Sequence, residues 1–153
     1  MGWSMIGELK AEEIERFLAS ETTGRIGCHA DGKTYVVPVT YVYDSGSVYG
    51  HTARGLKVQM MRRNPGVCFE VDRVEDIGHW RSVIAHGRYE ELQGGEAIRA
   101  MDLLIQRLTP LAADESSHPS YVLRAVEPAT ADGRGVILFR IRLTEKTGRF
   151  ERS

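Results

Sequence analysis

The stretch KTYVVPVTYVYDSGSVYGHTARGLKVQMMRRNP, residues 33–65, decides the fold of this chain. β-Branched and aromatic residues fill positions 34–43 almost throughout, which is typical of a strand. The Asp-Ser-Gly sequence at 44–46 predicts a tight turn, and residues 47–51 return as a second strand. Because Pro38 removes one backbone donor, the first strand is expected to lie at a sheet edge or to carry a bulge or bend.

The segment HTARGLK, residues 51–57, leads from the second strand into a short helix expected over residues 56–63. A helix that begins near Gly55 presents unpaired backbone N–H groups, which suit an anion. Thr52 can donate its hydroxyl, Arg54 offers a fork of donors and Lys57 adds a full charge. The pattern predicts either a phosphate site or a helix that Thr52 merely caps. P-loop and GxGxxG patterns do not occur in the sequence.

The rest of the chain alternates short strands with helices. Short connections favour antiparallel pairing, and about six strands in one domain over residues 1–153 predict a small closed or partly open barrel, mainly β with flanking helices. Residues 109–119 are expected to form a loop, and residues 121–126 are ambiguous. The other expected elements are a helix over 11–20, strands over 25–30, 67–74 and 80–92 (kinked at Gly87), a helix over 96–108 and a strand over 136–144.

Composition limits the classes of function. The formal net charge of −1 gives no overall field that would attract nucleic acid or an anionic membrane. Cys28 and Cys68 have no partner at metal-ligand spacing, so we expect two buried strand thiols and no metal site. No apolar run approaches the roughly 20 residues of a membrane span, and the first residues do not have a signal-peptide pattern. The expected compartment is the cytoplasm.

His51 and a pair of acids on one strand face are further candidates for chemistry. His51 ends a strand beside HTARGLK, where it could bond a ligand or transfer a proton near neutral pH, or be satisfied by backbone groups. Glu70 and Asp72 lie two residues apart on one face of a strand. Paired carboxylates sometimes perform acid–base work, but salt bridging or solvation is the favoured interpretation here.

The run WRS, residues 80–82, combines a large flat surface, a planar cation and a hydroxyl. Trp80, Arg81 and Ser82 could together grip a flat polar heterocycle. The alternative is a strand start with Trp80 in the core and the other two side chains outside. No nucleophilic triad can be argued from the spacings in the sequence, so an enzyme of this kind would rely on a cofactor for its chemistry.

Taken in order, GRIGCHADGKTYVVPVTYVYDSGSVYGHTARGLKVQMMRRNPGVCFEVD and WRSVIAHGRYEEL resemble the pyridoxamine-phosphate-oxidase-like flavin-binding split barrels. Within that family they are most similar to the nitroimidazole-resistance branch. The resemblance implies a six-stranded antiparallel split β-barrel and a homodimer with two FMN sites at its interface. It also implies cofactor-binding roles for three groups of residues: Thr52, Arg54, Gly55, Leu56 and Lys57 at the FMN phosphate; Val39, Thr40 and Tyr41 along the isoalloxazine ring; and Trp80, Arg81 and Ser82, commonly from the other subunit.

The same resemblance implies an FMN-dependent oxidoreductase that reduces a small electrophile, such as a nitroimidazole or another nitroaromatic, with electrons from a reduced nicotinamide. His51 matches a histidine found beside the flavin in the nitroimidazole branch and is the candidate catalytic residue. The further basic residues that bind a vitamin-B6 phosphate are missing from the pattern. Two alternatives stay open: a flavin storage, carrier or sensor protein without turnover, and a deazaflavin-dependent reductase. The same barrel also accommodates haem.

Overall fold

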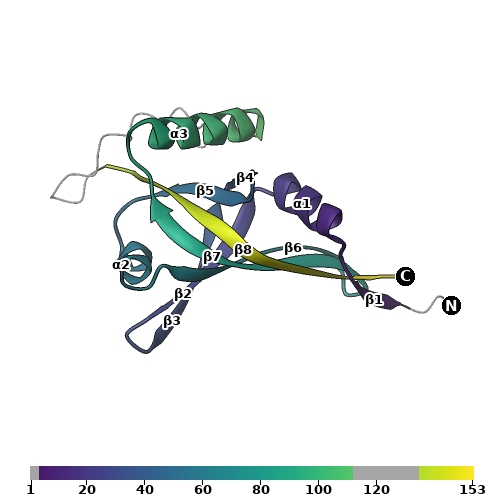
Figure 1. The fold of residues 1–153 in the computed structure, drawn as a ribbon. Helices are drawn as coiled ribbons and strands as arrows, with labels where there is room; N and C mark the ends of the chain where they lie inside the picture. Colours follow the sequence, from purple (N-terminus) through teal and green to yellow (C-terminus); the bar gives the residue numbers. More distant parts are fainter. Residues whose placement is uncertain (1–3, 112–134) are drawn as a thin grey trace.

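The computed structural model describes residues 4–111 and 135–153, which form one strongly twisted sheet with three helices packed on it (Figure 1). The elements in chain order are β1 (Met5–Glu8), α1 (Ala11–Ser20), β2 (Thr23–Ala30), β3 (Lys33–Thr40), β4 (Val42–Asp44), β5 (Ser47–Thr52), α2 (Leu56–Arg63), β6 (Gly66–Asp76), β7 (His79–Glu91), α3 (Gly94–Leu108), a 3₁₀ turn (Thr109–Leu111) and β8 (Ile137–Arg152).

Every strand pairing is antiparallel, which confirms the predicted class, mainly β with flanking helices. The strand order is β3-β2-β6-β7-β8-β5-β4, and β1 pairs with the far end of β8. The sheet of the described residues has eight strands rather than six, and it does not close. β3 also contacts β5, so the sheet curls toward a barrel that stays split on that side.

The two additional strands have separate physical causes. β1 is a four-residue strand whose sequence MIGE has no clear alternation, and it is held by pairing with β8. The expected strand over residues 34–43 is divided at Tyr41, where the backbone N–H leaves the ladder and donates to the carbonyl oxygen of Thr22 at 2.9 Å. Pro38 lies in β3, an edge strand, as its missing donor predicted.

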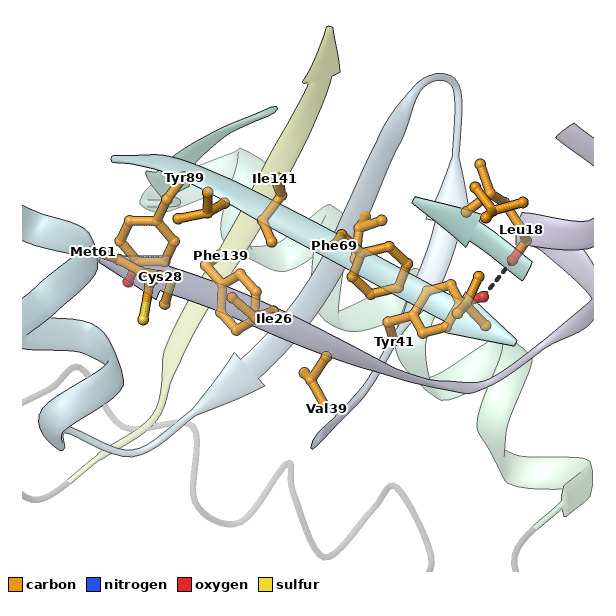
Figure 2. Packing of buried hydrophobic residues seen from close by; sticks show 14 of the residues in the cluster. Leu18, Ile26, Cys28, Val39, Tyr41, Met61, Phe69, Tyr89, Phe139 and Ile141 are labelled. Carbon is orange, nitrogen blue, oxygen red and sulfur yellow. Dashed lines mark hydrogen bonds between the residues drawn. The ribbon is translucent and has the colours of Figure 1, made fainter. Parts of the chain in front are cut away.

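The core lies on two sides of the sheet. On the inner side, α1 and α2 pack with Tyr41, Phe69 and Phe139, which are fully buried (Figure 2). On the outer side, α3 covers only the β4, β5 and β8 end through a smaller cluster around Leu104 and Leu138. Within the described residues, no helix or strand covers the outer side of β3, β2, β6 and β7.

Candidate functional site

The N-terminus of α2 is built as the sequence predicted, with Gly55 as the N-cap residue. Gly55 is extended (φ −177°, ψ −170°), makes no side-chain cap, and a Cβ built on it would meet no atom within 4 Å. The Thr52 hydroxyl donates to the carbonyl oxygen of Ala53 at 2.9 Å, so the alternative in which Thr52 caps the helix is wrong. The N-terminus of α2 therefore has no side-chain cap among the described residues, and there is open space beside Gly55.

Lys57 and His51 supply the electrostatic character of this region. Burial lowers the pKa of Lys57, which lies near the Cys28 thiol in the wall of the core. Burial also lowers the pKa of His51, and the nearby charge of Lys57 lowers it further. His51 is therefore a neutral imidazole at pH 7 beside a partly buried cation. Leu56 and Arg54 are exposed beside the same loop.

Residues 39–41, which are predicted to lie along the isoalloxazine ring, point their side chains to two different faces of the sheet. Val39 and Tyr41 point into the core, where the Tyr41 hydroxyl donates to the carbonyl oxygen of Leu18 at 2.7 Å (Figure 2). Thr40 is exposed between them. Only Thr40 of these three offers its side chain to a ligand on the outer face, and the other two could contact one through backbone atoms.

Trp80 and Arg81 lie at the other end of the sheet, in a cleft of about 710 Å³ between α1 and the ends of β6, β7 and β8. The Trp80 indole donates to Glu151 at 2.9 Å, and the Arg81 guanidinium lies 5.3 Å from the centre of the Phe17 ring. Ser82 is half-buried on the same strand. Trp80 is thus neither a core residue nor fully exposed, and the cleft walls carry charges of both signs.

A single chain does not bring together two of the three groups of predicted site residues, the group around Thr52 and the group around Trp80. Thr52 pairs with Ile137 at one end of β8, and Trp80 pairs with Glu151 near the other end. These β8 residues are 14 positions apart (151 − 137), a path of about 45 Å along the strand at about 3.3 Å per residue. The two groups therefore lie at opposite ends of β8.

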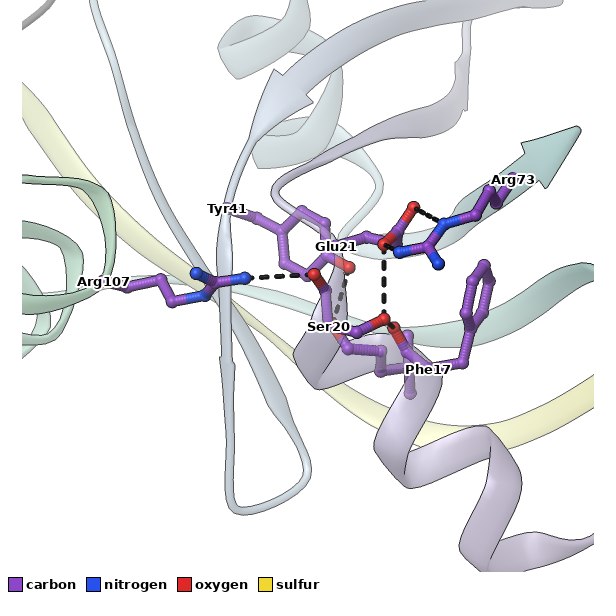
Figure 3. Close-up of polar contacts among 7 residues, drawn as sticks. Phe17, Ser20, Glu21, Tyr41, Arg73 and Arg107 are labelled. Carbon is purple, nitrogen blue, oxygen red and sulfur yellow. Dashed lines mark hydrogen bonds and ion pairs between the residues drawn. The ribbon is translucent and has the colours of Figure 1, made fainter. Parts of the chain in front are cut away.

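Two polar clusters include residues that the sequence analysis did not single out. At the end of α1, Arg107 donates to the carbonyl oxygen of Ser20 at 3.0 Å, and Arg73 pairs with Glu21 (Figure 3). These contacts fasten α1 to α3 and β6. On the outer face, Arg25 bridges the predicted carboxylate pair, which confirms salt bridging there. Arg25 alternates with the buried Ile26 along β2, and this alternation is the sequence signal for a side chain on the outer face. The register between β2 and β6 cannot be read from one sequence, so the pairing of Arg25 with the two carboxylates could not be predicted.

Cys28 is buried as predicted, whereas Cys68 is only half-buried because it lies on the outer face. None of the described helices is both long and apolar enough to cross a membrane. Within residues 4–111 and 135–153, no three His, Cys, Asp or Glu side chains gather as a metal site. The ambiguous segment 121–126 and most of the expected loop 109–119 lie outside the described residues.

An antiparallel sheet that curls without closing, with helices packed on it, places the chain among the small split β-barrels. The chain belongs to the pyridoxamine 5'-phosphate oxidase family, whose model matches residues 10–150. It is 30% identical over 139 residues to an uncharacterised protein of Rhizobium meliloti (strain 1021), covering 82% of this chain and 92% of that protein.

Solved structures with the same fold include an FAD-binding protein from Mesorhizobium loti. That protein is 27% identical, has a TM-score of 0.74 and is covered over 100% of its length by 99% of this chain. A protein from Bacteroides thetaiotaomicron, provisionally assigned to 5-nitroimidazole antibiotic resistance, is 19% identical with a TM-score of 0.70, and the match covers 98% of this chain and 92% of that one. The second likeness shows the fold alone.

Proposed function

We propose that this protein is an FMN-dependent oxidoreductase that reduces a small electrophile, such as a nitroimidazole, with electrons from a reduced nicotinamide. The observation that carries the proposal is the α2 N-terminus. Its free N–H groups and Lys57 fit a phosphate monoester, and the Gly55 position leaves room for one. The 27% identical FAD-binding protein supports a flavin as the group attached to that phosphate.

The residues have distinct duties in this proposal. A bound flavin supplies hydride and electron transfer between the nicotinamide and the acceptor. Lys57 and the α2 N–H groups hold the phosphate, and Thr40 lies along the edge of the site. The neutral His51 can accept or donate one hydrogen bond, which makes it the candidate for handling a proton near pH 7. Arg81 would offset negative charge that develops on the ring.

We also propose that the protein acts as a homodimer. The separation of Thr52 and Trp80 along β8 supports this, because a ligand that contacts both groups needs them from two copies. FMN is the flavin that the family resemblance implies, and FAD is the alternative that the Mesorhizobium loti protein suggests. The cytoplasmic compartment stays a prediction.

The visible spectrum of the purified protein, with chromatography of the released cofactor, tests the class of ligand. A flavin spectrum, release of FMN, and anaerobic reoxidation of the reduced flavin by a nitroimidazole are the expected results. A colourless protein that does not take up FMN or FAD would contradict the proposal. A flavin-loaded protein with no turnover against any nitroaromatic would instead indicate a storage or carrier protein.

Replacement of the lysine tests the phosphate assignment. Lys57→Met keeps the apolar stem and removes the charge, so FMN affinity should fall by about 1.5–3 kcal/mol, the value of a hydrogen bond to a charged group. Riboflavin, which has no phosphate, should bind the parent and the variant equally. Arg99→Ala on α3 is the control cation and should leave FMN affinity unchanged. Equal FMN affinity in Lys57→Met and the parent would refute the assignment.

A further inference from the structure

The inner side of the sheet carries three arginines at the end that is far from α2. Arg73 of β6 and Arg81 of β7 stand directly opposite each other, and each continues the face of its strand that is buried further along. Arg152 of β8 lies two residues beyond Phe150, which stands opposite Arg81, so it is a diagonal neighbour of Arg81 on the same face. Diagonal neighbours in a sheet lie about 7–8 Å apart. We call these three residues the arginine group.

Aromatic rings orient two of the three guanidinium groups. The Arg81 guanidinium lies 5.3 Å from the centre of the Phe17 ring of α1, and the Arg152 guanidinium lies 5.0 Å from the centre of the Phe150 ring. A planar cation that is held against a ring loses less freedom when it binds a ligand. Within residues 4–111 and 135–153, neither of them forms an ion pair with a carboxylate, whereas Arg73 pairs with Glu21 (Figure 3).

The arginine group is an unfavourable arrangement in the absence of an anion. Like charges that stand directly opposite each other destabilise a sheet, and one carboxylate offsets only one of the three cations. A bound anion with several oxygens removes this cost, because guanidinium groups donate to phosphate oxygens in pairs. The arrangement therefore favours a ligand that carries more than one phosphate.

The arginine group lines the cleft of about 710 Å³ between α1 and the ends of β6, β7 and β8. Small-molecule sites generally have volumes of about 300–1,000 Å³, so this cleft is much larger than a phosphate ion requires. Phe150 and Trp80 also line it and offer aromatic surface, and Arg16 of α1 adds a fourth guanidinium from the opposite wall. The cleft thus has room for a nucleoside attached to the phosphates.

The cleft also contains five glutamates, three of which are engaged elsewhere. Glu13 accepts a hydrogen bond from a backbone N–H at the start of α1 at 3.0 Å, and Glu151 accepts one from the Trp80 indole at 2.9 Å. Glu8 stands opposite Arg149, on the outer side of the sheet. The acids that remain on the inner side are Glu12 and Glu75, which are fewer than the arginines that line the cleft.

We propose that this cleft binds the ADP half of a reduced nicotinamide dinucleotide, with its pyrophosphate against the arginine group. The inference rests on the proposed function, in which such a dinucleotide supplies the electrons and Arg81 offsets charge on the flavin ring. Because Arg81 also belongs to the arginine group, a dinucleotide that is anchored there lies beside the flavin. The cleft then recognises the part of the donor that does not react.

Isothermal titration calorimetry of the flavin-loaded full chain with ADP-ribose tests the proposal, because ADP-ribose carries the pyrophosphate but no nicotinamide. Binding to the parent should weaken as the salt concentration rises, since salt screens exposed charges. Arg152→Gln should weaken ADP-ribose binding by about tenfold, the effect of one hydrogen bond to a charged group, and leave FMN affinity unchanged. Arg149→Gln, on the outer side of the same strand, is the matched control and should follow the parent.

Two results would show that the arginine group does not hold a pyrophosphate. One is a flavin-loaded parent that does not bind ADP-ribose, and the other is an equal loss of affinity in Arg152→Gln and Arg149→Gln. The source of the pyrophosphate is tested with FAD. If Arg152→Gln weakened FAD but not FMN, and the FAD-loaded parent no longer bound ADP-ribose, the pyrophosphate would be the cofactor's own and the assignment to the donor would be wrong.

The outcomes also separate this inference from the proposed function. A protein that binds flavin but not ADP-ribose would overturn the inference and leave the function standing. A protein that binds ADP-ribose through the arginine group but takes up no flavin would overturn the proposed function and the donor role, while the nucleotide site would remain.

Discussion

Tyr41 joins the inner core to the first helix. Its hydroxyl donates to the carbonyl oxygen of Leu18, and its ring meets Phe69 edge-on with centroids 4.9 Å apart. Burial raises the pKa of Tyr41, so the hydroxyl stays a neutral donor. This side chain is committed to the fold, which leaves its backbone as the part that can contact a ligand.

Removal of the Tyr41 hydroxyl should destabilise the fold without changing the site. Tyr41→Phe keeps the ring and leaves the Leu18 carbonyl without its donor, at a cost of about 1–3 kcal/mol in the free energy of unfolding. Urea denaturation measures the change. Tyr43→Phe, which removes a more exposed bond to Glu15, is the matched control and should cost less than about 1 kcal/mol. Equal losses in the two variants would contradict the buried bond.

His51 should make stability sensitive to acid. Its pKa in the folded state is lowered, first by burial and then by Lys57, so the unfolded chain binds the proton more readily. The free energy of unfolding should therefore decrease as pH falls below about 6.5, the ordinary histidine pKa. His51→Gln should reduce that slope, and the control His29→Gln should not.

A second measurement isolates the cause of the His51 shift. The NMR titration midpoint of His51 should lie below 6.5 in the parent and move upward in Lys57→Met, because the neighbouring charge is removed. A midpoint at or above 6.5 in the parent would show that the imidazole is not buried beside a cation.

The sequence was sufficient to predict which residues lie at the N-terminus of α2, because these residues are neighbours in the chain. Gly55, Thr52 and Lys57 are close in the chain, and the helix that presents them begins where it was predicted. The division of Val39, Thr40 and Tyr41 between two faces could not be read in the same way. β-Branched and aromatic residues occupy both faces of β3 and the strand after it, so no alternation marks which side is buried.

At the scale of elements, a bulge at Thr144 of β8, opposite His86 and Gly87 of β7, determines how the two longest strands stay paired. The register of β7 and β8 shifts between His86 and Gly87, where a kink was predicted. A Cβ on Gly87 would lie 2.4 Å from the carbonyl oxygen of Arg142 and 2.9 Å from Ile141. Backbone cannot yield as a flexible side chain does, so the position requires glycine.

Substitution of Gly87 should therefore weaken the pairing. Gly87→Ala is expected to reduce the free energy of unfolding by about 1–3 kcal/mol, the usual cost of overpacking. Gly95→Ala in the first turn of α3 is the control, because a Cβ there meets no atom within 4 Å, and it should leave stability unchanged or raise it by up to about 1 kcal/mol. A neutral result at Gly87 would contradict the close approach.

The length of β8 is the main feature of the fold that the sequence did not predict. The strand was expected to end near residue 144 but continues to Arg152. Residues 145–149 read EKTGR, a polar run with no hydrophobic alternation. The last part of β8 is stabilised by pairing with β1 on one side and β7 on the other. Because these partners are distant in the sequence, the local pattern could not predict that the strand continues.

At the scale of the whole molecule, the long β8 keeps the two groups of predicted site residues apart. The loop proposed to bind the phosphate, residues 52–57, follows β5 at one end, and the Trp80 cleft lies at the other, near β1 and the C-terminus (Figure 1). A barrel that remains split, with one sheet face uncovered, is suited to completion by a second copy. In the proposed dimer, each cofactor site uses the α2 loop of one copy and the Trp80 end of its partner.

Subunit complementation tests this claim most directly. Lys57→Met and Arg81→Glu are prepared as separate proteins, each expected to bind FMN at least tenfold more weakly than the parent. Subunits exchanged between them form heterodimers in which one of the two sites is intact, so FMN titration should recover parental affinity at one site per heterodimer. If the mixture bound no better than its separate components, each site would draw both groups from the same chain, and the account would be wrong.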